Sequence, residues 1–455
     1  MTTGGVAGTR PRRWRWETLM GGGAILQEDG FRRLWLGRLL SHTAINATLF
    51  TMLVLAVGEG NGASIKSALF IAAYLVPTAT LGTISGVLVD RLPKHLVLTA
   101  VNATRAGLMV LLLMSSTALP VVYGVALLIA ITSQFAGPAE AASVPQLVRQ
   151  DQLIIANSTS NLGGLVSQIV GFTVLPPFFL NTIGARPLFL TTAVLFGAAS
   201  VFFLGIHRLG PSAIDVDRMM DAVRNVRKQF AEGWETLSRD TEAYMSVIIF
   251  VLASTASLVG ATLMPRFTQE TLDIPVRNAV FVFLPAAVGV VAGLRLVQWL
   301  ERHVRKAWLV GAGFSLLAAS FICLALTRPL GNGLEGLNPF GAFDPGPFGD
   351  TSARIVVTVI FSTVATFSFS IVGVASRSLV NERVPLEFQG RVFAAQVVLT
   401  NLASIAPILL AGVLSELAGV EPVIFLTVFI LIGAAGWTLA RAVFRPEMTS
   451  HATAS

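Results

Sequence analysis

Charged side chains are scarce in this chain, at 13% of its 455 residues, whereas soluble domains carry about 25%. Apolar residues make up 54%, and the mean hydropathy is +0.73. This composition excludes an ordinary soluble domain. The apolar runs have the length of helices and do not alternate, which predicts an all-α integral membrane protein.

Cysteine is nearly absent. The single Cys323 lies in an apolar run, so a disulfide framework and a cysteine-based metal centre are excluded. The sequence also lacks a His-x-x-x-His pair and a Gly-x-x-x-x-Gly-Lys-Ser/Thr phosphate loop. A membrane metalloenzyme or an ATP-driven pump needs one of these patterns, so we expect no cofactor, no metal and no enzymatic activity.

Twelve apolar segments are each close to the ~20 residues that cross a ~30 Å hydrocarbon core. The predicted spans are 34–57, 66–89, 95–117, 119–139, 155–181, 187–207, 243–265, 278–299, 307–327, 353–376, 391–415 and 421–441. An even number of spans places both termini on the same side of the membrane.

Lysine and arginine are unequally distributed over the segments between these spans. With the N-terminus inside, 23 of the 32 bases fall on the inner side and six on the outer side. This bias predicts that both termini face the cytosol, and it explains the net charge of +7 without nucleic-acid binding. We expect a multi-pass monomer in the cell (plasma or inner) membrane, with the lipid bilayer and a small-molecule substrate as its partners.

The spans divide into two halves with a weak internal repeat. The turn at 90–95 recurs in charge pattern at 301–306, as expected of a transporter with two pseudo-symmetric halves. The predicted organisation is a basic cytosolic tail 1–33, a six-helix bundle 34–207, a cytosolic linker 208–242, a second six-helix bundle 243–441 and a cytosolic tail 442–455.

The linker 208–242 has apolar residues at helical spacing opposite a basic face. These apolar residues are Val216, Met219, Met220, Val223, Val226, Phe230, Trp234 and Leu237. This pattern predicts an amphipathic helix on the inner membrane surface rather than a packed domain. The outer loop 329–350 is rich in Gly and Pro, which predicts irregular structure.

The turn between the second and third spans carries a specific motif. It reads Gly-Val-Leu-Val-Asp-Arg-Leu-Pro-Lys-His over 86–95 and resembles the Gly-x-Leu-Ala-Asp-Arg-x-Gly-Arg-Lys pattern of the major facilitator superfamily. The matching residues are Gly86, Leu88, Asp90, Arg91 and Lys94, and Pro93 stands where the family prefers Gly. The stretches 31–37, 137–148 and 390–393 further resemble the branch of this superfamily that holds macrolide-efflux proteins and enterobactin exporters.

The resemblance implies a conformational latch at the inner surface. In the family, the carboxylate at the position of Asp90 caps the facing helix 11 and favours the outward-open state, with Arg391 or Arg149 as basic partners. The alternative is a solvated turn that only obeys the charge bias. The predicted latch residues, including a weaker twin in the second half, are Gly86, Asp90, Arg91, Lys94, Glu301, Arg302 and Arg391.

The sequence departs from the exporter pattern in two places. Helix 1 has no carboxylate after Ser41, and the Gly-Pro signature of antiporters in helix 5 is degraded to Gly163-Gly164, Gly171-Phe172 and Pro176-Pro177. Both departures weigh against proton antiport but not against transport.

Polar residues inside the spans are candidates for a substrate cavity. Arg38, His42 and Asn46 share one face of helix 1, and polar groups at that depth usually face a cavity or a bundle interior. Two further sets share faces of helices 5 and 11: Asn157, Asn161 and Gln168, and Gln396, Thr400 and Ser404. The alternatives are snorkelling of Arg38, a structural hydrogen bond of His42 and helix–helix contacts for the other sets.

Proton coupling is left open by the sequence. Histidine is the side-chain type that changes charge near neutral pH, so His42 is a candidate proton carrier. The predicted spans place Glu140 and Glu416 at helix ends, and Arg105 and Arg295 within about two turns of the cytosolic ends, where they can snorkel. Either His42 carries the proton, or Asp90 and Glu140 do, or transport is uncoupled from protons.

The function predicted from these observations is secondary active transport by alternating access. Export of a largely apolar or amphipathic small molecule is favoured, such as a drug, a macrolide-like compound or a siderophore. The alternatives are a lipid or lysolipid translocator and a membrane sensor or scaffold that retains a transporter fold without transporting.

Overall fold

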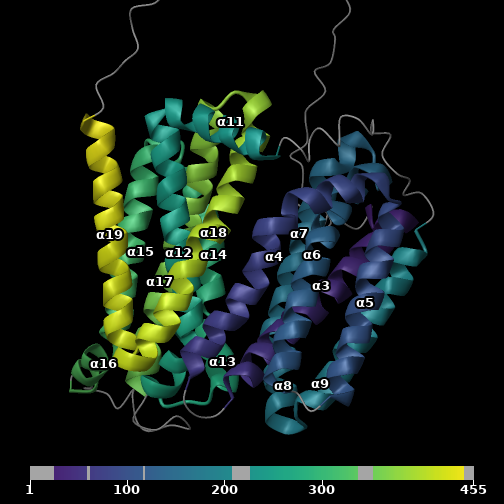
Figure 1. Cartoon of the computed structure of the whole chain (residues 1–455), viewed down its shortest axis with the longest axis horizontal. Coiled ribbons are helices and arrows are strands. Elements are labelled where there is room, and N and C mark those ends of the chain that lie inside the picture. The colour runs from purple at the N-terminus through teal and green to yellow at the C-terminus, as the bar shows by residue number, and fades with distance from the viewer. Residues whose placement is uncertain (1–24, 59–61, 116–117, 207–225, 337–351, 445–455) are drawn as a thin grey trace, which may run out of the picture.

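The computed structural model consists of two bundles of long helices that stand side by side (Figure 1). It describes residues 25–58, 62–115, 118–206, 226–336 and 352–444. Eleven helices in these ranges are long and apolar enough to cross a membrane. The twelfth predicted span is α19 (Val420–Phe444), whose apolar stretch Val420–Gly433 is shorter. The predicted all-α, multi-span fold is confirmed.

The first bundle contains the first six predicted spans. Its helices are α3 (Asp29–Val57), α4 (Ala63–Arg91), α5 (Lys94–Met114), α6 (Leu119–Leu147), α7 (Leu153–Gln168), the π-helix η2 (Ile169–Val174), α8 (Leu175–Thr182) and α9 (Ala185–Leu204). The predicted fifth span is therefore a composite of α7, η2 and α8. Buried aromatic side chains such as Phe31, Phe196 and Phe203 fill the space between its helices.

The second bundle contains the remaining spans. Its helices are α12 (Thr241–Glu270), the short 3-10 helix η3 (Val276–Asn278), α13 (Ala279–Phe283), α14 (Ala286–Leu300), α15 (Lys306–Ala325), α16 (Thr327–Gly336), α17 (Ser352–Arg383), α18 (Leu386–Ala418) and α19. Pro285 lies at the break between α13 and α14, where its ring cannot continue the hydrogen-bond ladder.

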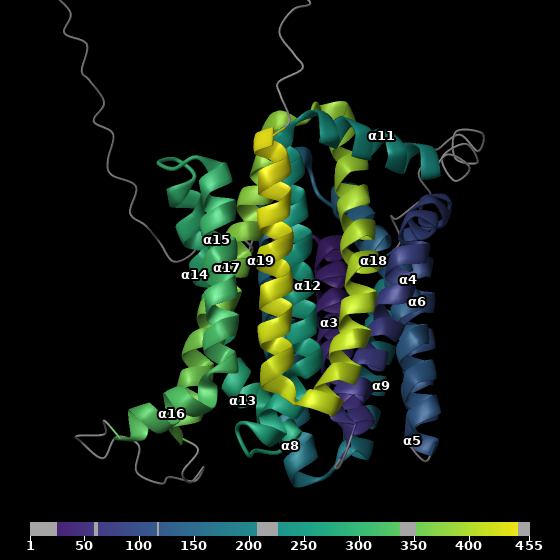
Figure 2. The same cartoon turned by 60° about the vertical axis from the view of Figure 1, so that its left-hand side comes forward.

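The segment between the bundles includes α11 (Val226–Arg239), which lies across one end of the helices (Figure 2). Leu237 is 1% exposed, and Trp234 packs edge-on against Tyr244 with 5.4 Å between ring centroids. The amphipathic prediction thus corresponds to a helix packed on α12 and α18 over 226–239. Residues 208–225 of the linker, and the tails 1–24 and 445–455, lie outside the described residues. We call the end with α11 the inner end and the opposite end the outer end.

Several helices extend beyond the predicted spans, such as α6 and α17, and one predicted loop contains a helix. The fourth span does not end at 139, because α6 continues through Pro138 and Pro145 to Leu147. Proline is tolerated within membrane helices when neighbouring groups satisfy the freed carbonyl, so it did not mark a helix end here. The predicted irregular loop 329–350 begins with the helix α16, and its part 337–350 lies outside the described residues.

The two bundles meet at the outer end. A Cβ atom at Gly412 of α18 would lie 2.6 Å from the Cβ atom of Ala68 of α4, and Asn181 of α8 donates a hydrogen bond to Asn278 of η3 at 3.1 Å. Figure 1 shows α4 leaning away from the second bundle toward the inner end. The arrangement is therefore closed at the outer end, as in an inward-facing transporter.

Candidate functional site

Buried charge is confined to one part of the described structure. Three charged residues are less than 9% exposed, namely Lys94, Arg105 and Glu140, and all three belong to the first bundle. Lys94 lies at an inner helix end and donates a hydrogen bond to the backbone carbonyl of Asp90 at 2.7 Å. Arg105 and Glu140 lie among α3, α5 and α6, where an unpaired charge would be strongly unfavourable.

The carboxylate of Glu140 receives two side chains from α3. The Nε atom of Arg38 lies 3.0 Å from Oε2, and Nε2 of His42 lies 3.0 Å from the same oxygen. Arg38 and His42 are one helical turn apart on α3, so both can reach one carboxylate on α6. An ionised carboxylate only accepts hydrogen bonds, so this geometry assigns a proton to Nε2 of His42.

The guanidinium of Arg105 is surrounded by hydroxyl groups. Its Nε donates to Thr132 at 3.1 Å, Nη1 to Ser41 at 3.3 Å and Nη2 to Ser133 at 2.8 Å. It also lies 5.8 Å from the centre of the Phe196 ring, a cation–π distance. The prediction that Arg105 snorkels to the inner surface was therefore wrong, because its nitrogens are satisfied within the bundle.

The group has a net positive charge. Two guanidinium ions, Arg38 and Arg105, face one carboxylate, Glu140, which leaves a net charge of +1 while His42 is neutral. His42 and Arg38 also keep exposed surface, 41% and 24% of their side chains, whereas that of Glu140 is 8% exposed. Arg38 and His42 thus lie between the buried carboxylate and the exposed side of the cluster.

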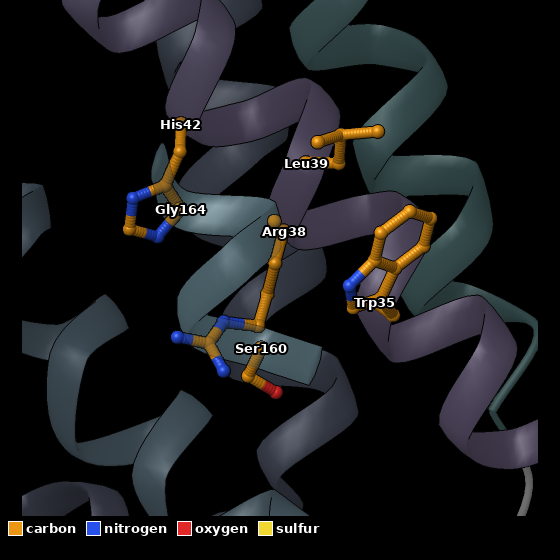
Figure 3. A pocket seen from close by; sticks show the side chains of 7 residues that line it. Trp35, Arg38, Leu39, His42, Ser160 and Gly164 are labelled. Atoms are coloured by element: carbon orange, nitrogen blue, oxygen red, sulfur yellow. The ribbon is translucent and has the colours of Figure 1, made fainter. Parts of the chain in front are cut away.

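A small pocket beside these two side chains connects the charge cluster to the fifth span (Figure 3). Figure 3 shows Arg38 and His42 projecting to one side of α3 and Leu39 to the other, with Ser160 and Gly164 of α7 behind them. A Cβ atom at residue 163, a glycine, would lie 2.8 Å from the indole nitrogen of Trp35. Gly163, one glycine of the degraded antiporter signature, therefore allows α7 to pack closely against α3.

The π-helix η2 continues this contact toward the outer end. A Cβ atom at Gly171 would lie 2.8 Å from the Cβ atom of Asn46, which places Asn46 in the α3–η2 contact. A single π-turn inserts an extra residue and shifts the helix face that follows it. The shifted face presents Phe172 toward the second bundle.

A larger cavity lies where η2 faces the second bundle. Its volume is about 520 Å³, and Gln168 and Phe172 line it from the first half. Five phenylalanines line it together with a few hydroxyl groups: Phe172, Phe267, Phe283, Phe321 and Phe369, with Ser257, Ser362 and Thr366. This is a mostly apolar pocket with a few convergent polar groups, the usual character of a small-molecule site.

The remaining cavity candidates lie in different surroundings. Asn157 and Asn161 are exposed on α7. Gln396 is 8% exposed, and Ser404 is fully buried, with its hydroxyl oxygen 2.9 Å from that of Thr255 on α12. The Thr400 hydroxyl is buried without a hydrogen-bond partner among the described residues. Ser404 thus joins α18 to α12 rather than facing the aromatic cavity.

The predicted latch residues lie at the inner end, on or beside α4, α14 and α18. Gly86 and Asp90 are on the last turns of α4, and Arg91 ends that helix. Arg391 of α18 pairs with Glu232 of α11 at 2.8 Å instead of with Asp90. In the second half, Glu301 follows α14, and Arg302 is exposed beside it. The basic partner predicted for Asp90 is thus engaged with α11, and the latch role of Asp90 stays a prediction.

Sequence reasoning missed the burial of Glu140 and Arg105. Because the predicted fourth span stopped at 139, Glu140 fell outside it, although it lies one turn beyond Ala136 on a continuous apolar face. No group of three or more potential metal ligands occurs among the described residues.

The comparison with protein families decides the identity of the fold. The sequence pattern of the family described as "Major Facilitator Superfamily" matches residues 34–407 of this chain. This chain belongs to the major facilitator superfamily. It is a secondary transporter and not an enzyme. No curated protein matches the chain.

Solved structures of other transporters share this fold at low sequence identity. A mutant form of the nucleoside transporter NupG has 13% identity and a TM-score of 0.66, covering 90% of this chain and 99% of its own. An auto-inhibited peptide transporter of the POT family has 13% identity and a TM-score of 0.64, covering 94% and 99%. A bacterial homologue of the human lysosomal transporter Spinster, inward-facing and unoccupied, has 12% identity and a TM-score of 0.63, covering 91% and 97%. At these identities the likeness concerns the fold alone.

Proposed function

We propose that this transporter exports a largely apolar or amphipathic small molecule from the cell, in the manner of the macrolide-efflux and enterobactin-exporter branch. The observation that carries this proposal is the phenylalanine-lined cavity of about 520 Å³ between η2 and the second bundle. Aromatic rings bury apolar cargo without requiring a fixed orientation, and the few hydroxyl groups add a limited number of polar contacts. A strongly polar cargo would leave most of its hydrogen-bonding groups unpaired in this cavity.

The cargo class is testable by binding to the purified protein. A panel of erythromycin, ethidium, enterobactin, lysophosphatidylcholine, uridine and a dipeptide spans the competing classes. A ligand that binds only the folded state raises the melting temperature by mass action. We expect shifts from erythromycin, ethidium or enterobactin. A melting-temperature shift from lysophosphatidylcholine alone favours a lipid translocator. A shift from uridine or the dipeptide alone contradicts the proposal. If a compound binds but is not transported in proteoliposomes, a sensor is favoured.

We further propose that proton binding at Glu140 drives the export. Protonation of the carboxylate at Oε2 removes the charge that holds Arg38 and His42, so both can leave α6. His42 has 41% of its side chain exposed, lines the small pocket beside α7 and contacts Oε2, so it is placed to pass a proton to Glu140. The sequence offered His42 and Glu140 as competing carriers, but their 3.0 Å contact supports a shared role.

Proteoliposomes with and without a pH gradient test this coupling, with whichever panel compound binds. We expect Glu140→Gln to abolish the stimulation of transport by the gradient, because a neutral amide cannot release a proton. His42→Gln should slow the gradient-driven rate while leaving exchange of cargo without a gradient. Asp151→Asn is the matched control, since this carboxylate is exposed and pairs with Arg149 in a surface turn. Gradient-driven transport that persists in Glu140→Gln would overturn the coupling proposal.

A further inference from the structure

The outer contact between the two bundles is centred on one carboxylate, Glu416. It lies two residues before the C-terminal end of α18 at Ala418. Its Oε1 accepts a hydrogen bond from the backbone N–H of Ser64 at 3.0 Å, and its Oε2 accepts one from the backbone N–H of Gly62 at 3.2 Å. Gly62 is the N-cap residue of α4 and Ser64 lies in its first turn, so a residue of the second half caps a helix of the first half.

Arg266 of α12 completes this contact. Its Nη1 lies 2.8 Å from Oε2 of Glu416, and its Nε lies 2.6 Å from Glu270 one turn further along α12. The side chains of Arg266 and Glu416 are only 15% and 22% exposed, so water screens this ion pair less than one at the surface. One carboxylate thus ties the N-terminus of α4 to both α18 and α12.

The N-cap residue of α4 cannot cap the helix with a side chain. It is Gly62, with φ at +87°, so among the described residues the printed side-chain partner of the N–H groups of Gly62 and Ser64 is Glu416. Free N–H groups at a helix N-terminus carry partial positive charge and favour an anion. If the outer end opens, Glu416 must separate from these groups, and they lose their partner.

The inner end of the same helix pair has the complementary arrangement. Asp90 precedes the C-terminal residue of α4, and α18 begins at Leu386 with Pro385 as an N-cap that offers no side-chain hydrogen bond. The two helices run antiparallel and pack on each other. Each helix therefore carries a carboxylate near its C-terminal end, and the N-cap residue of each helix makes no side-chain hydrogen bond to it.

We propose that Glu416, held by Arg266, is the outer gate latch of this transporter. It caps α4 while the transporter faces inward and releases α4 when the transporter faces outward. The latch predicted at Asp90 acts on the same helix pair at the opposite end. In this scheme Glu416 of α18 caps the N-terminus of α4 in the inward-facing state, and Asp90 of α4 caps the N-terminus of α18 in the outward-facing state. This proposal depends on transport by alternating access and is independent of the cargo.

Distances between spin labels at the outer surface test the gate. The labels are placed on Thr182→Cys of α8 and Arg277→Cys of η3, in a Cys323→Ser background, because both residues are exposed and adjoin the Asn181–Asn278 contact. We expect a short distance to dominate in the parent protein. In Glu416→Gln the ratio of long to short distances should rise about tenfold, since the amide loses the charge that attracts Arg266 and the helix end.

Glu270→Gln is the matched control, because Glu270 pairs with the same arginine but does not contact α4. We expect its distance distribution to equal that of the parent. Equal shifts in Glu270→Gln and Glu416→Gln, or no shift in Glu416→Gln, overturn the proposal.

Gly412→Val provides a second variant if Glu416→Gln folds poorly. Its added side chain would meet Ala68, since even a Cβ atom there would lie 2.6 Å away, and it should push the outer ends apart without changing any charge. Arg266→Gln in the Gly412→Val background should then add little, because the contact that Arg266 supports is already broken. A large additional shift would show that Arg266 acts elsewhere and would overturn its role in the latch.

Discussion

In the first bundle, Arg105 and Glu140 are buried among α3, α5 and α6, whereas the ion pairs described in the second bundle lie at helix ends and range from the half-buried Arg266–Glu416 to the more exposed Lys306–Glu382. Lys306 and Glu382 are 2.6 Å apart at the inner end, and 57% of the Glu382 side chain is exposed. Removing charges from water costs several kcal/mol per ion, so a buried cluster is retained only with good partners or for function. The second bundle contributes most of the aromatic cavity instead. Among the described residues, the most buried charges therefore lie in the first bundle, and most residues that line the aromatic cavity lie in the second.

The largest expected effect concerns the buried cluster. Glu140→Gln leaves Arg38 and Arg105 without a counter-charge, which should destabilise the folded state by about 3 kcal/mol. Thermal unfolding in detergent measures this loss. Glu382→Gln removes a carboxylate that is exposed at the inner end and should leave the melting temperature unchanged. Similar melting temperatures for both variants would contradict the assignment of buried ion chemistry to the first bundle.

A double variant sharpens the same comparison. Arg38→Gln combined with Glu140→Gln removes one charge of each sign, so the double variant should have a larger free energy of unfolding than Glu140→Gln alone. No recovery would mean that Arg105, rather than Arg38, is the partner whose charge Glu140 balances.

The aromatic cavity gives the next largest effect. Phe321→Ala should weaken binding of the panel compound about tenfold, because burial of one aromatic ring contributes on the order of 1.5–3 kcal/mol. Isothermal titration of the purified protein measures the dissociation constant. Phe429→Ala is the control, since the Phe429 side chain of α19 is 77% exposed and does not line the cavity. Equal weakening by both variants would indicate a general loss of packing.

The sequence predicted the architecture well because membrane spans depend on length and apolarity alone. The multi-span helical fold followed from hydropathy and segment length: eleven helices among the described residues can cross a membrane, and α19 has a shorter apolar stretch. The position of Glu140 did not, because Gly137 and Pro138 indicate a loop when only local preferences are considered. Within a bundle, helix α6 continues past both residues.

The candidate site was predictable only in part for a related reason. His42 and Arg38 were found from their shared face on one helix. Their partner Glu140 lies 98 residues from His42, and the hydroxyl groups around Arg105 come from α3 and α6. Contacts between helices depend on the packing of the bundle, and periodicity within one segment does not specify them.

A smaller effect is expected from removing the carboxylate at the inner end of the α4–α18 pair, Asp90. Asp90→Asn should shift the spin-label distances toward the short, inward-facing form about fivefold, opposite in direction to Glu416→Gln. The double variant should return close to the parent distribution, because one carboxylate is removed from each bundle. Shifts of Asp90→Asn in the same direction as Glu416→Gln would break the proposed exchange while leaving the outer gate intact.

The smallest expected effect concerns the hydroxyl groups of the second bundle. The Ser404 hydroxyl donates to the carbonyl of Thr400 at 2.7 Å, so the hydrogen between Ser404 and Thr255 belongs to Thr255. Ser404→Ala removes one acceptor between α18 and α12, and such bonds contribute about 0.6 kcal/mol on average in membrane bundles. Thr255 can turn its hydroxyl to the carbonyl of Val251 on its own helix, which limits the loss further. We therefore expect a small decrease in melting temperature and an unchanged dissociation constant for the cargo. A loss of cargo binding in Ser404→Ala at an unchanged melting temperature would show that polar groups on helix 11 contact the cargo, and that the substrate site extends beyond the aromatic cavity.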